Sequence, residues 1–134
     1  MKELTLAATV ENIEAVTDFV GAMLEEADCP MKAQMQINIA IDELFGNIAH
    51  YAYAPETGEA TVQVDIDDGM AAITFIDSGV PYNPLTAAAP DTSLSAEERS
   101  IGGLGIFMVK KSMDEISYLY EDGKNKLTIC KKIG

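Results

Sequence analysis

Apolar residues recur between positions 32 and 53 with the spacing of one face of a helix. The stripe consists of Ile37, Ile41, Leu44, Ile48 and Tyr51, each three or four positions from the next. Such a stripe packs against a core. The pattern therefore predicts a long amphipathic helix from about residue 32 to residue 53.

A period of two predicts strands, and a period of 3.6 predicts helices, in the rest of the chain. Two pairs of alternating segments are joined through Asp-Gly, which favours tight hairpin turns. Thr9 stands where it would cap the first helix. The predicted elements are a strand at 3–8, a helix at 10–27, a hairpin of strands at 60–66 and 70–76, a helix at 105–113 and a hairpin of strands at 115–120 and 124–131.

Residues 81–100 fit neither pattern, and they form a connection far longer than the usual ~4–6 residues. They are either an ordered lid or a disordered surface loop, and both alternatives allow motion. The order of elements predicts an α/β fold. It is a two-layer sandwich, with a mixed, mostly antiparallel sheet covered on one face by three helices, in a single domain spanning residues 1–134.

The charge balance narrows the range of partners. A formal net charge of −13 at pH 7 repels nucleic acids and anionic membranes, so neither is expected to bind. The beginning of the chain has no apolar signal core, which predicts a cytoplasmic protein. Cys29 and Cys130 form neither a CxxC pair nor a metal-ligand cluster, and both are predicted to be reduced thiols.

The basic residues are unevenly distributed. No lysine or arginine lies between Lys32 and Arg99, and seven of the nine basic residues fall at positions 99–134. An anionic ligand should therefore use the C-terminal part of the chain. A phosphate bound near the middle of the long helix would need a divalent cation beside it, which points to Mg²⁺.

A second face of the long helix carries polar groups. Glu43, Asn47 and His50 follow one another at helical spacing, while Gly46 thins the side chains beside them. This face either holds a ligand that approaches the helix closely or is simply a solvated polar edge. His50 is interpreted as a histidine of the pocket edge or core.

Two glycine-containing segments are further candidates for a ligand site. Asp77-Ser78-Gly79 follows a strand, where a carboxylate and a close backbone approach suit a ring with a hydrogen-bond donor, although the same triplet also makes common turns. Gly102, Gly103 and Gly105 precede a helix, and backbone N–H groups there suit phosphate. The glycine cluster can equally serve as a hinge.

Taken together and in this order, the Glu/Asn helix face, the Asp-x-Gly strand end, the long connection and the glycine-rich helix start resemble the GHKL ATPase superfamily. That superfamily includes gyrase, chaperone, histidine-kinase and mismatch-repair ATPases. Within it the chain looks like the bacterial anti-sigma factor serine/threonine protein kinases. The resemblance covers nearly all 134 residues and implies the Bergerat fold, with an ATP lid at about residues 81–103.

The resemblance also implies roles for individual residues. Glu43 would be the general base and Asn47 the magnesium ligand, while Asp77 would bind the adenine amino group and Gly79 would leave room for the base. The remaining nucleotide contacts would come from Arg99, Gly102, Gly103, Leu104, Gly105 and Lys110.

The function that follows is a Mg-ATP-dependent kinase that phosphorylates a serine or threonine of an antagonist protein and sequesters a sigma factor. It would act in transcription regulation, and such kinases commonly form homodimers. Members of that kinase group carry an arginine in the first helix, which this chain lacks. The alternatives are a nucleotide-binding switch that docks partners without kinase activity, a detached histidine-kinase catalytic domain and a sandwich that binds no nucleotide.

Overall fold

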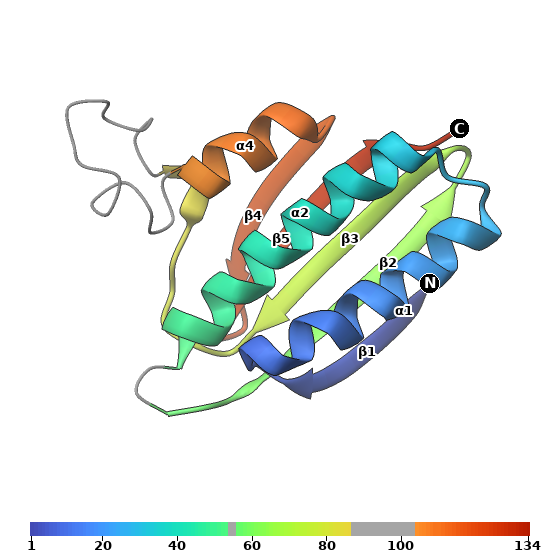
Figure 1. Cartoon of the computed structure of the whole chain (residues 1–134). Helices are drawn as coiled ribbons and strands as arrows, with labels where there is room; N and C mark the ends of the chain where they lie inside the picture. The colour runs from blue at the N-terminus through green and yellow to red at the C-terminus, as the bar shows by residue number, and fades with distance from the viewer. Residues whose placement is uncertain (54–55, 87–103) are drawn as a thin grey trace.

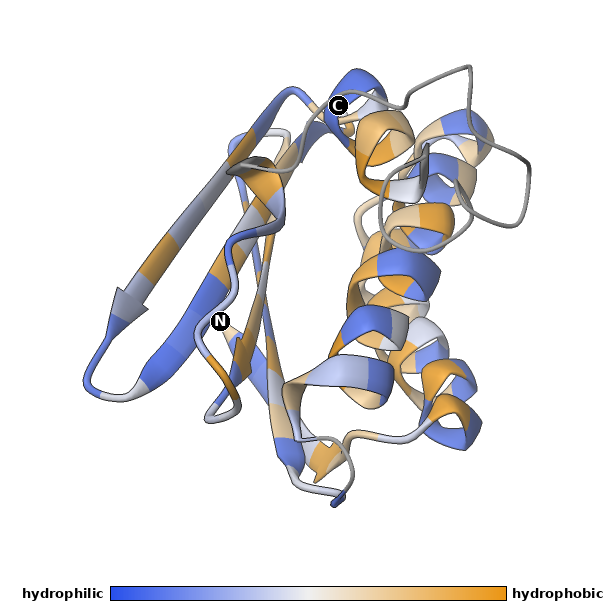
Figure 2. Cartoon of the chain, turned by 90° about the vertical axis from the view of Figure 1, so that its left-hand side faces the viewer, coloured by the Kyte–Doolittle hydropathy of each residue, from blue (hydrophilic) through white to orange (hydrophobic). Residues whose placement is uncertain are grey.

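The computed structural model describes residues 1–53, 56–86 and 104–134. It has two layers, a five-stranded sheet and a layer of helices that covers one face of it (Figures 1 and 2). The strands are β1 (Lys2–Ala7), β2 (Glu59–Asp67), β3 (Met70–Asp77), β4 (Glu115–Glu121) and β5 (Lys124–Lys132). The helices are α1 (Ile13–Glu26), α2 (Met31–Asn47) and α4 (Leu104–Ser112).

The sheet has the strand order β1-β2-β3-β5-β4. Every neighbouring pair is antiparallel. The predicted two-layer fold is confirmed. The sequence predicted a mixed, mostly antiparallel sheet, and these four pairings are all antiparallel. Both predicted hairpins, β2–β3 and β4–β5, are present. In this order β3 and β5 lie side by side at the centre, so the ends of these two strands can share one site.

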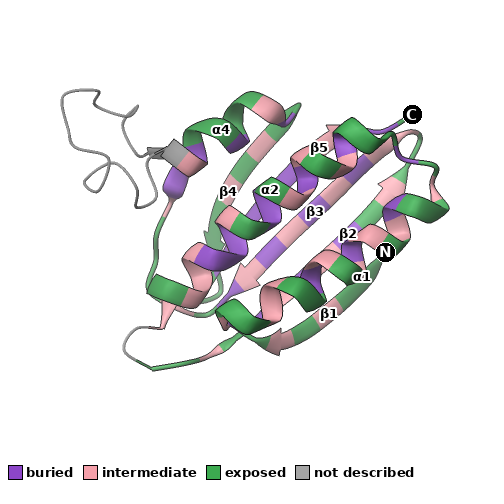
Figure 3. Cartoon of the chain, in the orientation of Figure 1, coloured by how far each residue is buried: buried purple, intermediate pink, exposed green. Residues whose placement is uncertain are grey.

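The core lies between the two layers (Figure 3). On α2 the apolar stripe reaches the sheet through Ile37, Ile41 and Leu44, all buried as the spacing predicts. Phe45 on α2 and Phe75 on β3 are among the largest fully buried side chains. Removing a side chain of that kind from water contributes roughly 1.5–3 kcal/mol, so α2 is anchored firmly over the central strands.

Two helix ends and the predicted lid differ from the prediction. The first helix begins as a short 3-10 turn, η1 (Val10–Asn12), and the side chain of Thr9 makes no capping hydrogen bond. The long helix ends at Asn47 and continues as a π-helical segment, η2 (Ile48–Ala52). In the predicted lid, η3 (Pro84–Thr86) is a 3-10 turn, and residues 87–103 lie outside the described part of the chain.

The structure also bears on two predictions from composition. Both cysteines are free thiols. Within residues 1–53, 56–86 and 104–134, no helix combines the length and apolar character that crossing a bilayer requires.

The two hairpin turns supply a test of the fold. Gly69 and Gly123 both have a left-handed backbone, with φ of 75° and 74°, so alanine is strained at either position. A Cβ on Gly69 would lie 2.9 Å from the carbonyl oxygen of Gly134, whereas a Cβ on Gly123 meets nothing within 4 Å. We expect G123A to lower the free energy of unfolding by about 1 kcal/mol. We expect G69A to lower it by more, by about 2 kcal/mol. Urea denaturation measures both, and equal losses would contradict the contact at Gly69.

Candidate functional site

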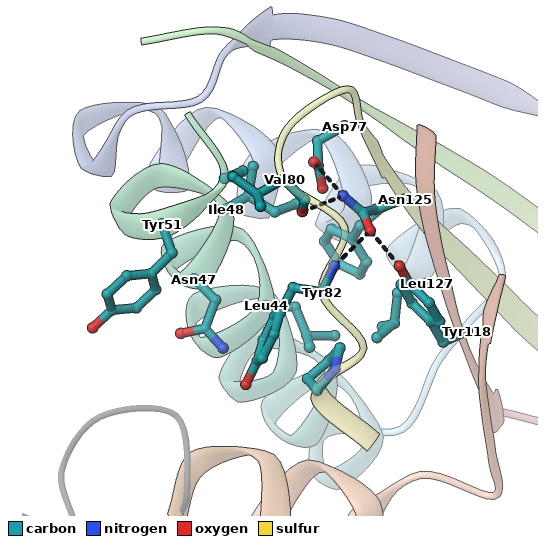
Figure 4. Close-up of a pocket in the computed structure, with 13 residues that line it drawn as sticks. Leu44, Asn47, Ile48, Tyr51, Asp77, Val80, Tyr82, Tyr118, Asn125 and Leu127 are labelled. Carbon is teal, nitrogen blue, oxygen red and sulfur yellow. Dashed lines mark hydrogen bonds between the residues drawn. The ribbon is translucent and has the colours of Figure 1, made fainter. Parts of the chain in front are cut away.

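A pocket opens where the helix layer ends over the central strands (Figure 4). Its walls come from the end of α2, from η2, from the segment after β3 and from β4 and β5, and its empty volume, including the open mouth, is about 550 Å³. Pockets of that size hold small-molecule ligands. Most of the lining is apolar or aromatic. The lining residues are Leu44, Asn47, Ile48, Tyr51, Ala52, Phe75, Asp77, Val80, Tyr82, Pro84, Tyr118, Asn125 and Leu127.

Asp77 is the last residue of β3, and its side chain lies at the inner end of the pocket with 6% of its surface exposed. Its Oδ1 accepts a hydrogen bond from the backbone N–H of Gly79, at 2.9 Å. The same Oδ1 accepts from Nδ2 of Asn125, at 3.0 Å. Among the described residues no donor reaches Oδ2. A carboxylate oxygen is therefore left to accept a hydrogen bond from a ligand.

Asn125 faces Asp77 across the sheet and joins the strands to the segment after β3. Its Nδ2 also donates to the carbonyl oxygen of Val80, at 3.0 Å. Its Oδ1 accepts from the backbone N–H of Tyr82, at 3.1 Å, and from the hydroxyl of Tyr118. With two N–H groups donating and two bonds accepted, the hydrogen-bonding capacity of this carboxamide is filled.

Sequence reasoning missed Asn125, although a signal for it was present. Asn125, Leu127 and Ile129 alternate along β5 and all point into the protein. A polar residue in an inward position must find hydrogen-bond partners. The hydroxyl of Tyr118 is one of them, and burial raises its pKa, which favours the protonated form that donates the bond.

Gly79 is required for a packing contact that the sequence analysis did not predict. A Cβ at this position would overlap the carbonyl oxygen of Ala52, at the end of η2. The next residue, Val80, donates its backbone N–H to the same oxygen at 2.9 Å. The absence of a side chain at Gly79 is therefore required by the packing of this segment against the helix end, whatever ligand the pocket holds.

Glu43 and Asn47 lie on the side of α2 that faces α4. Nδ2 of Asn47 donates to Oε1 of Glu43 at 3.4 Å, as the spacing of four residues predicts. Asn47 lines the pocket, whereas the carboxyl group of Glu43 lies against Gly105 of α4, where a Cβ would overlap it. The close approach to this face of α2 is therefore made by Gly105. At Gly46, where the sequence analysis expected it, an added Cβ would meet only an ordinary contact with Ile13, at 3.9 Å.

The ionisation of Glu43 is shifted by its surroundings. Burial raises the pKa of this carboxyl group, the hydrogen bond from Asn47 lowers it, and the negative charge of Asp42 raises it. The net direction is upward. A carboxyl group with a raised pKa takes up a proton more readily at neutral pH than an exposed one, which is what general-base chemistry needs.

The other predicted site residues are scattered or lie beyond the described part of the chain. Nζ of Lys110 donates to the carbonyl oxygen of Leu85 at 2.9 Å and so ties α4 to η3. Leu104 begins α4, beside Gly105. His50 is exposed and stacks at a tilt on Tyr51, which lines the pocket. Of the two interpretations of His50, the core is wrong and the pocket edge is left. Arg99, Gly102 and Gly103 lie outside the described residues.

A magnesium ion would have to be held by few protein groups. Residues 1–53, 56–86 and 104–134 contain no cluster of three or more His, Cys, Asp or Glu side chains that could hold a metal. Mg²⁺ is commonly bound by one or two protein oxygens together with phosphates and waters. The amide oxygen of Asn47 at the pocket fits that arrangement, because its Nδ2 already bonds Glu43.

Comparison with known proteins gives one family. The model of the histidine kinase-like ATPase domain matches residues 6–131. Similar proteins include the serine-protein kinase RsbW of Bacillus mycoides, 28% identical over 93% of this chain and 81% of that protein. The serine-protein kinase RsbW of Listeria monocytogenes is 26% identical over 90% and 80%. The resemblance to the anti-sigma factor kinases of the GHKL superfamily is confirmed.

A solved structure shares the fold. The crystal structure of the RsbU and RsbW domains of a Mycobacterium tuberculosis protein aligns with a TM-score of 0.68 at 17% sequence identity. The alignment covers 99% of this chain and 33% of that longer one. It supports the arrangement of the two layers described above.

Glu43 supplies a test of the electrostatics of this site. Because its folded-state pKa is raised, the folded chain holds the proton more tightly than the unfolded chain. Its contribution to stability therefore falls as pH rises from the unfolded pKa through the folded one. We expect wild type to lose stability relative to E43Q as the pH rises above about 4.3, the ordinary pKa of a glutamate, and passes through the raised pKa of Glu43. Urea denaturation at several pH values measures this, with D42N as the control that keeps most of the effect. If the free energies of unfolding of wild type and E43Q changed in parallel with pH, the pKa of Glu43 would not be raised in the folded chain.

Proposed function

The chain belongs to the histidine kinase-like ATPase family, and from that premise we propose that it binds Mg-ATP and phosphorylates a serine or threonine of an antagonist protein. The proposal includes sequestration of a sigma factor, with the antagonist acting as the anti-anti-sigma protein. The observation that carries it is a single pocket that has Asp77 at one end and Asn47, bonded to Glu43, on the adjoining helix.

The apolar end of the pocket suits the adenine base. Oδ2 of Asp77 would accept a hydrogen bond from the exocyclic amino group, since Oδ1 is engaged with Gly79 and Asn125. Apolar side chains from both layers, including Ile48, Val80 and Leu127, would pack against the ring. A buried acceptor favours an amino group over a carbonyl at that position of the base.

The phosphates would extend along α2 toward the beginning of α4. Asn47 would hold Mg²⁺ through its amide oxygen, and the ion would neutralise charge on the phosphates. The backbone at Gly102, Gly103, Leu104 and Gly105 would contact phosphate oxygens at a helix N-terminus. Arg99 and Lys110 would add positive charge, for which Lys110 would have to leave the carbonyl of Leu85.

Glu43 would orient and deprotonate the attacking hydroxyl of the antagonist. Its pKa is raised by burial, and it lies one turn of α2 from Asn47. The hydroxyl proton would pass to the carboxylate as the oxygen attacks the terminal phosphorus, and the leaving group would be ADP. Most of the rate would come from holding these groups in place.

A second candidate is a nucleotide-dependent switch that docks partners without transferring phosphate. One observation favours it, since α1 (Ile13–Glu26) contains no arginine to face a protein substrate. ATP binding without phosphate transfer to any partner would select the switch. Acid-labile phosphate on a histidine of a partner would instead select a detached histidine-kinase domain.

The proposed partners also suggest where the protein acts and in what form. A sigma factor and its regulators are cytoplasmic, and we propose the same location for this chain. We also include a homodimer in the proposal, with residues 1–134 forming one ATPase domain per subunit and residues 81–103 serving as its lid.

Removing the amide of Asn47 tests the metal site. We expect N47A to weaken ATP binding on the order of tenfold in excess Mg²⁺, because a metal ligand is lost. In EDTA the difference from wild type should disappear. Titration calorimetry measures both conditions. N38A is the matched control on the same helix, because Asn38 does not line the pocket and its buried Oδ1 finds no hydrogen-bond partner among the described residues. Unchanged affinity of N47A in Mg²⁺ would refute the metal assignment.

Removing the carboxylate of Glu43 tests the kinase. We expect E43Q to bind ATP but to transfer labelled phosphate to its antagonist about 10²- to 10⁴-fold more slowly, because the general base is gone. The control is D42N, which alters an exposed carboxylate next to Glu43. Transfer by E43Q at the rate of wild type would exclude Glu43 as the base, and absence of transfer by wild type would favour the switch.

A further inference from the structure

The side chain of Asn125 is fully engaged with the protein and has nothing left for a ligand. Its four hydrogen bonds go to Asp77, Val80, Tyr82 and Tyr118. These partners come from β3, from the segment that follows it and from β4. Figure 4 shows the carboxamide at the end of the pocket, with dashed lines running to each of them. Asn125 therefore acts on the pocket only through its neighbours.

We propose that Asn125 is a positioning residue for recognition of the nucleotide base, which holds the Asp77 carboxylate in the orientation that presents Oδ2 to the ligand. The inference rests on the proposed binding of ATP. Nδ2 of Asn125 and the backbone N–H of Gly79 both donate to Oδ1 of Asp77. A carboxylate bound in this way has one oxygen fixed, so the direction of the second oxygen is fixed too.

The same carboxamide fixes the wall of the pocket beside Asp77. Nδ2 holds the carbonyl of Val80 and Oδ1 holds the N–H of Tyr82, at 3.0 and 3.1 Å. Val80 and Tyr82 both line the pocket and are otherwise exposed, at 61% and 51%. Their backbone has few other anchors, apart from the bond from Val80 to Ala52 at 2.9 Å. One side chain thus sets the position of both the acceptor and the adjoining wall.

An amide is required at this position because it is asymmetric. Its N–H side meets two acceptors, Oδ1 of Asp77 and the carbonyl of Val80, and its oxygen side meets two donors. In N125D an oxygen replaces the NH₂ group at nearly the same size and shape. Three acceptors then face one another, and two carboxylates share one site. One of the pair takes up a proton at an unusually high pH.

The charged and titratable groups around the carboxamide are few. Asp77 on β3 faces it directly, Tyr118 on β4 bonds to it, and the segment after β3 adds the phenol of Tyr82. Helix α2 presents only uncharged residues to the pocket, and η2 adds Tyr51. Lys124 and Lys126 alternate with Asn125 and point to the opposite face of the sheet. Two titratable groups lie next to the lining, Glu43, which is bonded to Asn47 and has a raised pKa, and His50, which stacks on Tyr51. Both are present in wild type and in N125D alike, so a difference between the two proteins between about pH 5 and pH 8 reports the new carboxylate pair.

The test compares ATP affinity of N125D and wild type across that pH range. At about pH 8 both carboxylates are charged and repel, Asp77 turns, and we expect N125D to bind ATP at least about tenfold more weakly than wild type. Near pH 5.5 a shared proton restores a hydrogen bond to Asp77, and the ratio of the two dissociation constants should fall toward one. The titration of ATP itself affects both dissociation constants equally and therefore cancels in their ratio. N12D is the matched control, since Asn12 lies on η1 and does not line the pocket.

Amide hydrogen exchange without nucleotide provides a second readout. In N125D at about pH 8 the N–H of Tyr82 keeps its acceptor, the unchanged Oδ1, whereas the N–H of Gly79 loses Oδ1 of Asp77 as that carboxylate turns. Selective loss of protection at Gly79, reversed at low pH, supports the inference. A ratio of one at every pH, or a uniform loss of affinity together with protection at both amides, overturns it. If wild type binds no ATP, the proposed function fails, and the exchange at Gly79 still decides whether Asn125 positions Asp77.

Discussion

The hydrogen-bonded pair of Asp77 and Asn125 is the constraint on which the rest of the site depends. These are the two buried polar side chains of the described residues, and they lie directly opposite each other on β3 and β5. A buried carboxylate is costly unless its oxygens are paired. The segment after β3 pairs Asp77 through the N–H of Gly79, and it pairs Asn125 through the N–H of Tyr82 and the carbonyl of Val80. Because it must do so, the segment turns back over the strands and becomes a wall of the pocket.

The helix layer adapts to that wall at its end. Beyond Asn47 the backbone becomes π-helical, and such segments recur at functional sites because they redirect side chains within a helix. Tyr51, which would continue the buried stripe in a regular helix, is 47% exposed and lines the pocket. The carbonyl of Ala52 ends the segment and receives the N–H of Val80. The end of η2 and the segment after β3 therefore meet through their backbones, and no side chain between them fills the pocket.

The features that the sequence predicted correctly are those that depend on residues close together in the chain. The hairpins depend on neighbours in sequence, and Asp-Gly pairs with positive φ at both residues form the turns where expected. The Glu43–Asn47 bond is likewise local, at four residues. The contact of Glu43 with Gly105, the bond from Lys110 to Leu85 and the bonds of Asn125 to β3 and the segment after it join residues 25 to 62 positions apart. Such contacts depend on the register of strands and the crossing of helices, which periodicity does not contain.

The two ends of the pocket divide the work of binding in a way that follows from charge. Among the described residues that line it, none is a lysine or arginine, and the chain carries a net charge of −13. A triphosphate entering this field is repelled unless a cation accompanies it. The base end, by contrast, is apolar apart from Asp77 and Asn125 and is little affected by ionic strength. Under the proposed function, selectivity among bases would therefore depend on the fixed carboxylate of Asp77, and affinity for phosphate would depend on magnesium and on the basic residues that follow residue 98. A change that weakens binding of the phosphates would then leave the preference for the base intact.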